Sequence, residues 1–317
     1  MSCKTEQKQS TKELENIKLS GVVFGTSYKA IYSSEVDYTN QFDSLFAVIN
    51  TSLSTYISDS DISKINRNED VVIDKHFENV FLKSKEIFKR TNGFFDPTIG
   101  DVVNAWNFGA NKNKFITDSV TIENLMTSVG FNKVTLIDKK IVKQPNAYLE
   151  FNAIAKGYGV DVIAQFLENK NISNYLIEIG GEIRVKGKNK EKDKPWRVGL
   201  DEPRFDGDQS VFKAISLKDE AMATSGTYRK FKVDEDGNKY AHIINTKTGY
   251  PTKTNILSVS VIAEDCMTAD GYATAFQAMG LDGVKPFLEN NIKLKAFLIF
   301  ENDNNELETL TLNGFPE

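Results

Sequence analysis

Residues 175–186 read Tyr-Leu-Ile-Glu-Ile-Gly-Gly-Glu-Ile-Arg-Val-Lys. Two short runs rich in β-branched and aromatic residues, at 175–179 and 183–186, predict two consecutive strands. Gly180-Gly181 between them permits either a tight turn or the close approach of a flat ligand, and we interpret it as a turn. The stretch therefore predicts strands that follow one another without a helix between them.

The same kind of strand recurs along the chain. Further short strands are predicted at 133–137, 147–151, 196–200, 211–217, 242–245, 257–263 and 295–300, and an interrupted strand at 21–32. Helices are predicted at 35–53, 76–90, 122–129, 155–168, 266–279 and 284–289, with a turn-rich segment at 58–68. Many strands with few helices favour an α+β fold, with mixed or antiparallel sheets flanked by helices. Because no Pro/Ser-rich linker divides the chain, we expect one compact unit with subdomains.

Charge and composition exclude several classes of protein. The 317 residues include 39 basic and 44 acidic residues, a net charge of −5, which gives no electrostatic footprint for nucleic acid. No apolar run approaches the length of a membrane span. The two cysteines, Cys3 and Cys266, are a poor disulfide pair, because Cys266 lies in a predicted helix and Cys3 lies near the start.

The start of the chain allows two interpretations. Met-Ser-Cys followed by a polar segment resembles a bacterial lipoprotein, in which Cys3 would carry lipid and residues 1–19 would form a flexible tether to a domain at 20–317. The alternative is an incidental cysteine on a disordered tail. The only membrane contact that we expect is through this lipid.

His242 is the first catalytic candidate. It is one of two histidines and lies in residues 240–251, Tyr-Ala-His-Ile-Ile-Asn-Thr-Lys-Thr-Gly-Tyr-Pro, between a predicted strand and a turn. A histidine there can accept a proton near neutral pH, although it can also be a core residue bonded to backbone. The other histidine, His76, lies at the start of an amphipathic helix, and we interpret it as structural or solvated.

Asp270 and Thr274 are the candidate metal ligands. They are four residues apart in a predicted helix, so a carboxylate and a hydroxyl lie one turn apart on one face. Two hard oxygen ligands suit Mg²⁺, which usually completes its coordination with water and phosphate oxygens. The alternative is an aspartate that interacts with the helix dipole and a threonine that bonds back to the helix.

Lys156 follows Asn152-Ala153-Ile154-Ala155 at a predicted strand-to-helix junction, where a lysine can meet a phosphate or carboxylate. A surface lysine at a helix start is the alternative. The common nucleotide and hydrolase motifs GxxxxGK[ST], HExxH, GxSxG and GxGxxG after the first strand are absent. A nucleotide site would have to be built in another way.

Taken in order, eight segments between about Gly21 and Gly280 resemble the ApbE family, the FAD:protein FMN transferases. They are residues 24–28 (FGTSY), 54–58 (STYIS), 92–98 (NGFFDPT), 153–157 (AIAKG), 178–182 (EIGGE), 224–228 (TSGTY), His242-Ile243-Ile244 with Thr248-Gly249, and Ala269-Asp270 with Thr274. Each segment alone is a weak signal, whereas eight in sequence are specific.

The resemblance implies a Mg²⁺-dependent transfer of the FMN half of FAD to a threonine or serine hydroxyl of a partner protein, with release of AMP. It implies that the Ala153 carbonyl, Asp270 and Thr274 hold the metal, and that His242 takes the proton from the acceptor hydroxyl. The flavin-binding positions that it implies are Phe24, Tyr56, Phe94, Phe95, Asp96, Glu150, Lys156 and Ile243. It further implies export, with a lipid anchor at the bacterial cell membrane facing the periplasm or exterior.

Three positions depart from the family pattern. The family usually has Met where Phe24 stands, Asp where Glu150 stands and Gly where Asn152 stands. Phe24 is still apolar, whereas Glu150 adds a methylene that can shift its hydrogen bond. Asn152 can still adopt unusual backbone angles.

Two other functions use the same residues. A Mg²⁺-dependent FAD pyrophosphatase would pass FMN to water, and a flavin-binding lipoprotein would carry flavin without turnover. The presence of both His242 and the Asp270/Thr274 pair argues against a carrier, because binding alone needs no base.

Overall fold

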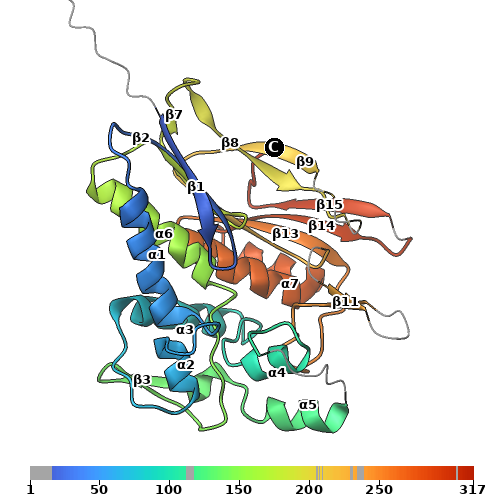
Figure 1. The fold of residues 1–317 in the computed structure, drawn as a ribbon. Helices are drawn as coiled ribbons and strands as arrows, with labels where there is room; N and C mark the ends of the chain where they lie inside the picture. Colours follow the sequence, from blue (N-terminus) through green and yellow to red (C-terminus); the bar gives the residue numbers. More distant parts are fainter. Residues whose placement is uncertain are drawn as a thin grey trace, which may run out of the picture.

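The computed structural model describes residues 16–111, 118–204, 206, 208, 210–228, 231–233, 239–304 and 306–317. Its largest element is an eight-stranded sheet with the order β1-β2-β5-β6-β10-β13-β14-β15, in which all neighbours are antiparallel (Figure 1). The strands are β1 (Asn16–Val23), β2 (Thr26–Ser33), β5 (Tyr175–Ile179), β6 (Glu182–Lys186), β10 (Ala221–Gly226), β13 (Ile256–Ala263), β14 (Lys295–Glu301) and β15 (Leu307–Leu312).

Helices cover one face of this sheet. Apolar side chains of α1 and α6 pack on the β1, β2 and β5 half, those of α7 pack on the β10, β13 and β14 half, and α3 packs against α7. Helices α6 and α7 lie side by side beneath the sheet in Figure 1. The helices are α1 (Thr39–Leu53), α2 (Asp61–Asn66), α3 (Lys75–Arg90), α4 (Gly100–Ala105), α5 (Ser119–Met126), α6 (Ala155–Asn169) and α7 (Cys266–Glu289), the last interrupted at Gly280.

A small sheet covers the opposite face. It consists of β7 (Lys188–Asn189), β8 (Lys194–Asp201) and β9 (Val211–Leu217). Its inward side chains, among them Trp196 and Leu217, form one core with residues of β5, β6, β10, β13 and β14. Every residue of β13 is consequently buried, which fits a strand covered on both faces. Two hairpins, β3 (Thr135–Ile137) with β4 (Lys140–Val142) and β11 (Phe231–Val233) with β12 (Lys239–Ala241), and a 3₁₀ turn at Phe131–Lys133 complete the described elements.

The predicted α+β class with antiparallel sheets is confirmed. The predicted interrupted strand at 21–32 is wrong in detail, because it is a hairpin of two strands. Phe24 and Gly25 form a two-residue loop with φ of 50° and 73°, and two consecutive positive φ values are the signature of a type I′ turn. The turn reverses the chain and places Phe24 at the end of the hairpin.

Two other predicted strands are wrong. Residues 147–151 and 242–245 form only isolated bridges, Ile99 with Tyr148 and Ile244 with Pro251. Their backbone groups bond to loops instead of a neighbouring strand; the amide of Glu150, for example, donates to the Pro97 carbonyl at 2.9 Å. The apolar residues of both segments are explained by burial, and a buried segment need not be a strand.

Several described elements were not predicted, among them α2, α4, β4, β7, β10, β11, β12 and β15. The turn-rich segment 58–68 contains α2, which begins where the Ser60 side chain accepts a hydrogen bond from the Ser63 amide. Strand β10 has the small, partly polar sequence AMATSG, and β15 is an exposed edge strand, so neither has a clear strand pattern. Strand β10 is central to the sheet because of its neighbours β6 and β13.

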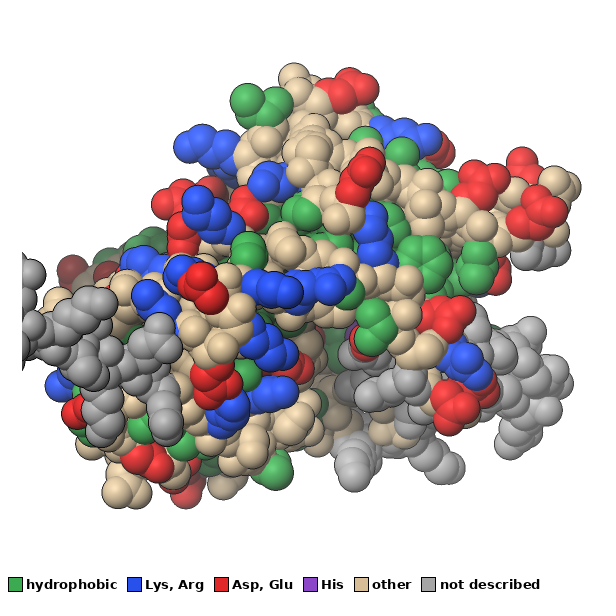
Figure 2. Space-filling model, turned by 90° about the horizontal axis from the view of Figure 1, so that it is seen from above, with side chains coloured by type: hydrophobic (Ala, Val, Ile, Leu, Met, Phe, Trp, Pro, Cys, Tyr) green, Lys and Arg blue, Asp and Glu red, His purple; other side chains and the backbone are tan. Residues whose placement is uncertain are grey.

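Three further features concern the first strand, the length of the helices and the charge of one face. Strand β1 starts at Asn16, so residues 16–19 of the predicted tether belong to the sheet, while Cys3 lies outside the described residues. No helix in the described ranges is both long and apolar enough to cross a bilayer. On the face seen from above in Figure 2, basic and acidic side chains lie interspersed.

Candidate active site

A cavity of about 860 Å³ is lined by residues from the β1–β2 turn, the end of α1, three loops, the end of β10 and helix α7. All twelve residues singled out by the sequence line it: Phe24, Tyr56, Phe94, Phe95, Asp96, Glu150, Ala153, Lys156, His242, Ile243, Asp270 and Thr274. The histidine and the acid-plus-hydroxyl pair therefore share one cavity, although the chain between them contains a complete strand, β13.

Phe24 reaches the cavity from the end of the β1–β2 hairpin. Its ring meets Phe46 of α1 edge to face, with the centroids 5.6 Å apart. A Cβ at Gly159 of α6 would lie 2.6 Å from the Phe24 ring, so a glycine is needed there for the ring to pack against the helix. The position thus provides a fixed apolar wall, which is what a flat ring ligand requires.

The loop after α3 provides Phe94, Phe95 and Asp96. Asp96 is 7% exposed, and its carboxylate accepts hydrogen bonds from the Thr98 amide at 2.9 Å, the Thr98 hydroxyl at 2.5 Å and the Phe131 amide at 3.2 Å. Burial raises the pKa of Asp96, while these hydrogen bonds oppose the rise. The carboxylate therefore fixes the conformation of its own loop as well as lining the cavity.

The segment that carries His242 is a loop closed by backbone hydrogen bonds, from Asn245 to Tyr250 and from Thr252 to Ile243, each 2.8 Å long. The Thr246 hydroxyl donates to the Gly93 carbonyl at 2.5 Å and so joins this loop to the Phe94 loop. The imidazole of His242 faces the ring of Phe108, with centroids 6.3 Å apart. The candidate base therefore lies beside the ring of Phe108, which also lines the cavity.

Helices α6 and α7 meet at Gly157 and Asp270. A Cβ at Gly157 would lie 2.4 Å from the Cys266 carbonyl oxygen and 2.8 Å from the Asp270 Cβ, so only glycine allows this approach. The Gly157 amide donates to Asp270 Oδ2 at 2.9 Å. In a regular helix this amide would bond to the carbonyl of Ala153, four residues earlier. That carbonyl accepts no hydrogen bond from the described residues.

The donor set at this junction suits a hard cation. The Ala153 carbonyl and the Thr274 hydroxyl have no hydrogen-bond partner among the described residues, and the Asp270 carboxylate lines the same cavity. Within the described ranges, no three His, Cys, Asp or Glu side chains lie together as a metal cluster. Magnesium is commonly bound by one or two carboxylates, with water and substrate oxygens completing its shell, so this set is sufficient.

Charge in the cavity also favours a cation. Lys156 Nζ lies 2.5 Å from the Glu182 carboxylate, which is 2% exposed. Burial raises the pKa of both Glu182 and Asp270; Lys156 opposes each rise, and Asp270 adds to that of Glu182. The ion pair of Lys156 is with Glu182, so the Asp270 carboxylate has the Gly157 amide as its hydrogen-bond partner and shares the cavity with Ala153 and Thr274.

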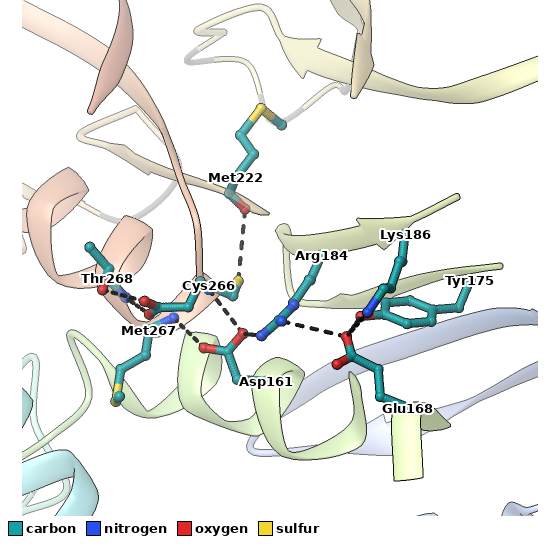
Figure 3. Close-up of polar contacts among 10 residues, drawn as sticks. Asp161, Glu168, Tyr175, Arg184, Lys186, Met222, Cys266, Met267 and Thr268 are labelled. Carbon is teal, nitrogen blue, oxygen red and sulfur yellow. Dashed lines mark hydrogen bonds and ion pairs between the residues drawn. The ribbon is translucent and has the colours of Figure 1, made fainter. Parts of the chain in front are cut away.

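The start of α7 is held by a second network, shown in Figure 3. Asp161 of α6 accepts hydrogen bonds from the amides of Cys266 at 3.0 Å and Met267 at 2.8 Å, and its carboxylate pairs with Arg184 at 2.7 Å. These amides belong to the first turn of α7 and have no partner inside the helix. Asp161 therefore sets where α7 begins relative to α6, one turn before Asp270.

Glu150 and Asn152, two departures from the family pattern, contact one another. The Asn152 amide donates to the Glu150 carboxylate at 2.9 Å, and both residues line the cavity. The longer acid is therefore oriented by the side chain that replaces the usual glycine.

Glu182 is the main functional candidate that the sequence did not identify. It stands in the quoted segment 178–182, but a glutamate at the start of a strand has no feature that distinguishes it from a surface residue. Its burial follows from the position of β6 beside β10, a strand that was not predicted. His76, by contrast, fits its structural interpretation, since its Nδ1 lies 2.9 Å from the Tyr158 hydroxyl and it is not among the cavity residues.

Comparisons with known proteins relate this chain to one family. The model of the ApbE family matches residues 24–298. The chain is 37% identical over 312 residues to a Haemophilus influenzae protein named FAD:protein FMN transferase, covering 92% of this chain and 89% of that protein. A Vibrio cholerae protein of the same name is 34% identical over 304 residues, covering 92% and 90%.

Solved structures have the same fold. The structure titled Flavin Transferase ApbE from Vibrio cholerae superposes with a TM-score of 0.86 at 32% identity, over 95% of this chain and 98% of that one. The apo form of a flavinyl transferase ApbE from Pseudomonas stutzeri gives a TM-score of 0.85 at 23% identity, over 95% and 96%, which supports the fold alone.

The Asp161 network predicts a loss of stability. We expect Asp161→Asn to lower the free energy of unfolding by about 3 kcal/mol, because the half-buried Arg184 loses the nearer of its two acidic partners and keeps only Glu168, at 3.6 Å. Urea denaturation measures the change. The double variant Asp161→Asn/Arg184→Met should recover part of the loss, and a single variant as stable as the wild type would contradict this role for Asp161.

Proposed function

This chain belongs to the ApbE family, and from that premise we propose that it transfers the FMN moiety of FAD to a threonine or serine hydroxyl of another protein, with Mg²⁺ and with release of AMP. The observation that carries the proposal is that one cavity is lined by His242, by the Asp270/Thr274 pair and by aromatic side chains, namely Phe24, Phe94 and Phe95. A base, a set of oxygen ligands and a surface for a flat ring are the three components that this reaction needs.

The reaction breaks the phosphoanhydride bond of FAD and forms a phosphoester bond to the acceptor. His242 accepts the proton of the acceptor hydroxyl, and the oxygen then bonds to the phosphorus on the FMN side of the FAD pyrophosphate. The bond from that phosphorus to the bridging oxygen breaks, and AMP leaves with the electron pair. Removal of the proton makes the hydroxyl a better nucleophile, and a positioned general base contributes about 10²–10⁴-fold in rate.

The remaining residues bind and orient FAD. Phe24, Phe94, Phe95 and Ile243 provide apolar contacts for the rings, and Lys156 provides positive charge for the phosphates. The Ala153 carbonyl, Asp270 and Thr274 would hold Mg²⁺. When bound there, the metal would neutralise charge that develops on the phosphate oxygens.

Two alternatives share the cavity, and one assay separates all three. The protein is incubated with FAD and Mg²⁺, with and without a candidate acceptor protein. Flavin fluorescence on the acceptor after denaturing electrophoresis supports the transferase. Free FMN and AMP in both samples indicate a pyrophosphatase, and intact FAD after long incubation indicates a carrier. Export and lipid attachment at Cys3 stay predictions, which mass spectrometry of the protein isolated from its cell would test.

The first prediction concerns the base. We expect His242→Ala to retain FAD binding and to lower the rate of flavin transfer about 10²–10⁴-fold, because the acceptor hydroxyl keeps its proton. The rate is measured by in-gel flavin fluorescence, and FAD binding by fluorescence titration. His76→Ala removes the other histidine, which does not line the cavity, and is the matched control. Undiminished labelling by His242→Ala would remove this residue from the mechanism.

The second prediction concerns the metal. We expect EDTA to abolish transfer, excess Mg²⁺ to restore it, and Asp270→Ala to remain inactive at any Mg²⁺ concentration, because the one carboxylate of the proposed ligand set is lost. Asp282→Asn, an exposed acid on the same helix, is the control. Full activity in EDTA would exclude a metal requirement.

The third prediction concerns the Glu150–Asn152 contact. We expect Asn152→Ala to weaken FAD binding about fivefold, which corresponds to about 1 kcal/mol for one partly exposed hydrogen bond to a charged group. Fluorescence titration with FAD measures the affinity. Gln165→Ala removes an exposed hydrogen bond to Asn169 on α6, outside the cavity lining, and should leave the affinity for FAD unchanged. Equal affinity of the Asn152 variant and the wild type for FAD would show that the contact with Asn152 does not contribute to FAD binding.

A further inference from the structure

Glu182 has no role in the reaction as written above, yet it is the most completely buried acid in the cavity lining. Its residue exposure is 2%, below the 7% of Asp96 and the 5% of Asp270. A buried carboxylate is costly unless it is paired, and the pair that it makes is with Lys156, at 2.5 Å. The two residues come from different elements, the start of β6 and the first turn of α6.

Lys156 is close enough to influence both carboxylates. Lys156, Glu182 and Asp270 line the same cavity. Lys156 also directly precedes Gly157, whose amide donates to Asp270. The flexible lysine side chain therefore has two possible partners at the junction of α6 and α7, and in the structure its ion pair is with Glu182.

Whether Lys156 pairs with Glu182 or with Asp270 decides whether Asp270 can bind a cation. An ammonium bound to the carboxylate of Asp270 would occupy an oxygen that a divalent cation needs and would repel that cation. Paired with Glu182, the ammonium leaves the Asp270 carboxylate open to a cation that the Ala153 carbonyl and the Thr274 hydroxyl can also bind. The cavity thus contains a lysine for phosphate and an acid for metal without their neutralising one another.

We propose that Glu182 is a positioning residue that holds the ammonium of Lys156 away from Asp270 and so keeps Asp270 available to a divalent cation. This inference rests on the proposed function through the Mg²⁺ site. It assigns Glu182 neither contact with the metal nor contact with the reacting atoms. Its effect on the metal passes through Lys156.

The test is binding of Mn²⁺ to the full chain without FAD, followed by the loss of the free Mn²⁺ electron paramagnetic resonance signal. Mn²⁺ prefers the same carboxylate, carbonyl and water ligands as Mg²⁺. We expect Glu182→Gln to weaken Mn²⁺ binding about tenfold or more, because Lys156 turns to Asp270. The double variant Glu182→Gln/Lys156→Met should bind Mn²⁺ within about threefold of the wild type. Glu178→Gln, at a half-buried acid of β5, is the matched control and should bind Mn²⁺ as the wild type does.

A crystal structure of Glu182→Gln without metal separates positioning from a simple loss of negative charge. Positioning requires Lys156 Nζ within hydrogen-bond distance of Asp270 in that variant. A lysine that stays where it is in the wild type would overturn the proposal, as would a double variant that binds Mn²⁺ as weakly as Glu182→Gln, since Glu182 would then act on the metal directly. Unchanged Mn²⁺ binding by Glu182→Gln would also overturn the proposal.

Failure of this inference is distinguishable from failure of the proposed function. A wild-type chain that binds no Mn²⁺ removes the metal site and, with it, the role of Glu182. The expected pattern of Mn²⁺ binding without any flavin transfer would leave the role of Glu182 intact and refute the transferase. If Glu182→Gln does not fold, Glu182→Asp keeps the charge with a shorter reach to Lys156; weaker Mn²⁺ binding then supports positioning, and wild-type binding contradicts it.

Discussion

The contact between Gly157 and Asp270 is the interaction on which the candidate site depends. Gly157 lets α6 approach α7 so closely that a side chain at this position would collide with α7, and the amide of this glycine bonds to the Asp270 carboxylate instead of to its own helix. The exchange has two results. Asp270 is fixed in the cavity, and the carbonyl of Ala153 is left without a backbone partner beside it. One hydrogen bond therefore prepares two of the three proposed metal ligands.

The rest of the site is arranged around this junction by contacts between loops. Asp161 fixes the first turn of α7, the Thr246 hydroxyl joins the His242 loop to the Phe94 loop, and the type I′ turn places Phe24 against α6. Each contact joins segments that are far apart in the chain. The cavity is consequently a product of the tertiary structure, with no single motif that contains it.

The sequence predicted the class of fold and the membership of the cavity well, for different reasons. The structure places strands at the predicted residues 175–179 and 211–217; the apolar pattern of 175–179 matches its burial, whereas Val211 and Phe212 are exposed. His242, Lys156, Asp270 and Thr274 were found from residue chemistry and spacing, and the other cavity residues through the resemblance, because the segments quoted for it line one cavity. The pattern failed where burial had another cause, as at 147–151 and 242–245, whose apolar residues lie in buried loops.

What the sequence could not provide is information about neighbours. The six residues of β10 have little strand character, and only pairing with β6 and β13 makes them the centre of the sheet. Glu182 depends on the same arrangement, since its burial and its contact with Lys156 exist only once β6 lies against β10 and near α6. The hydrogen bond between Asn152 and Glu150 is also a contact of side-chain geometry, although the two residues are only two positions apart.

The order of strands in the large sheet has a consequence for the synthesis of the protein. Strand β10 lies between β6, which precedes it in the chain, and β13, which follows it, and helix α7 is followed by two further strands, β14 and β15, that extend the sheet beyond β13. A ribosome that has synthesised only the first 250 residues has added Phe24, the Phe94 loop and His242 to the chain, but neither Asp270 nor strands β13, β14 and β15. The nascent chain thus gains its complete cavity late, when nearly the whole polypeptide has left the exit tunnel.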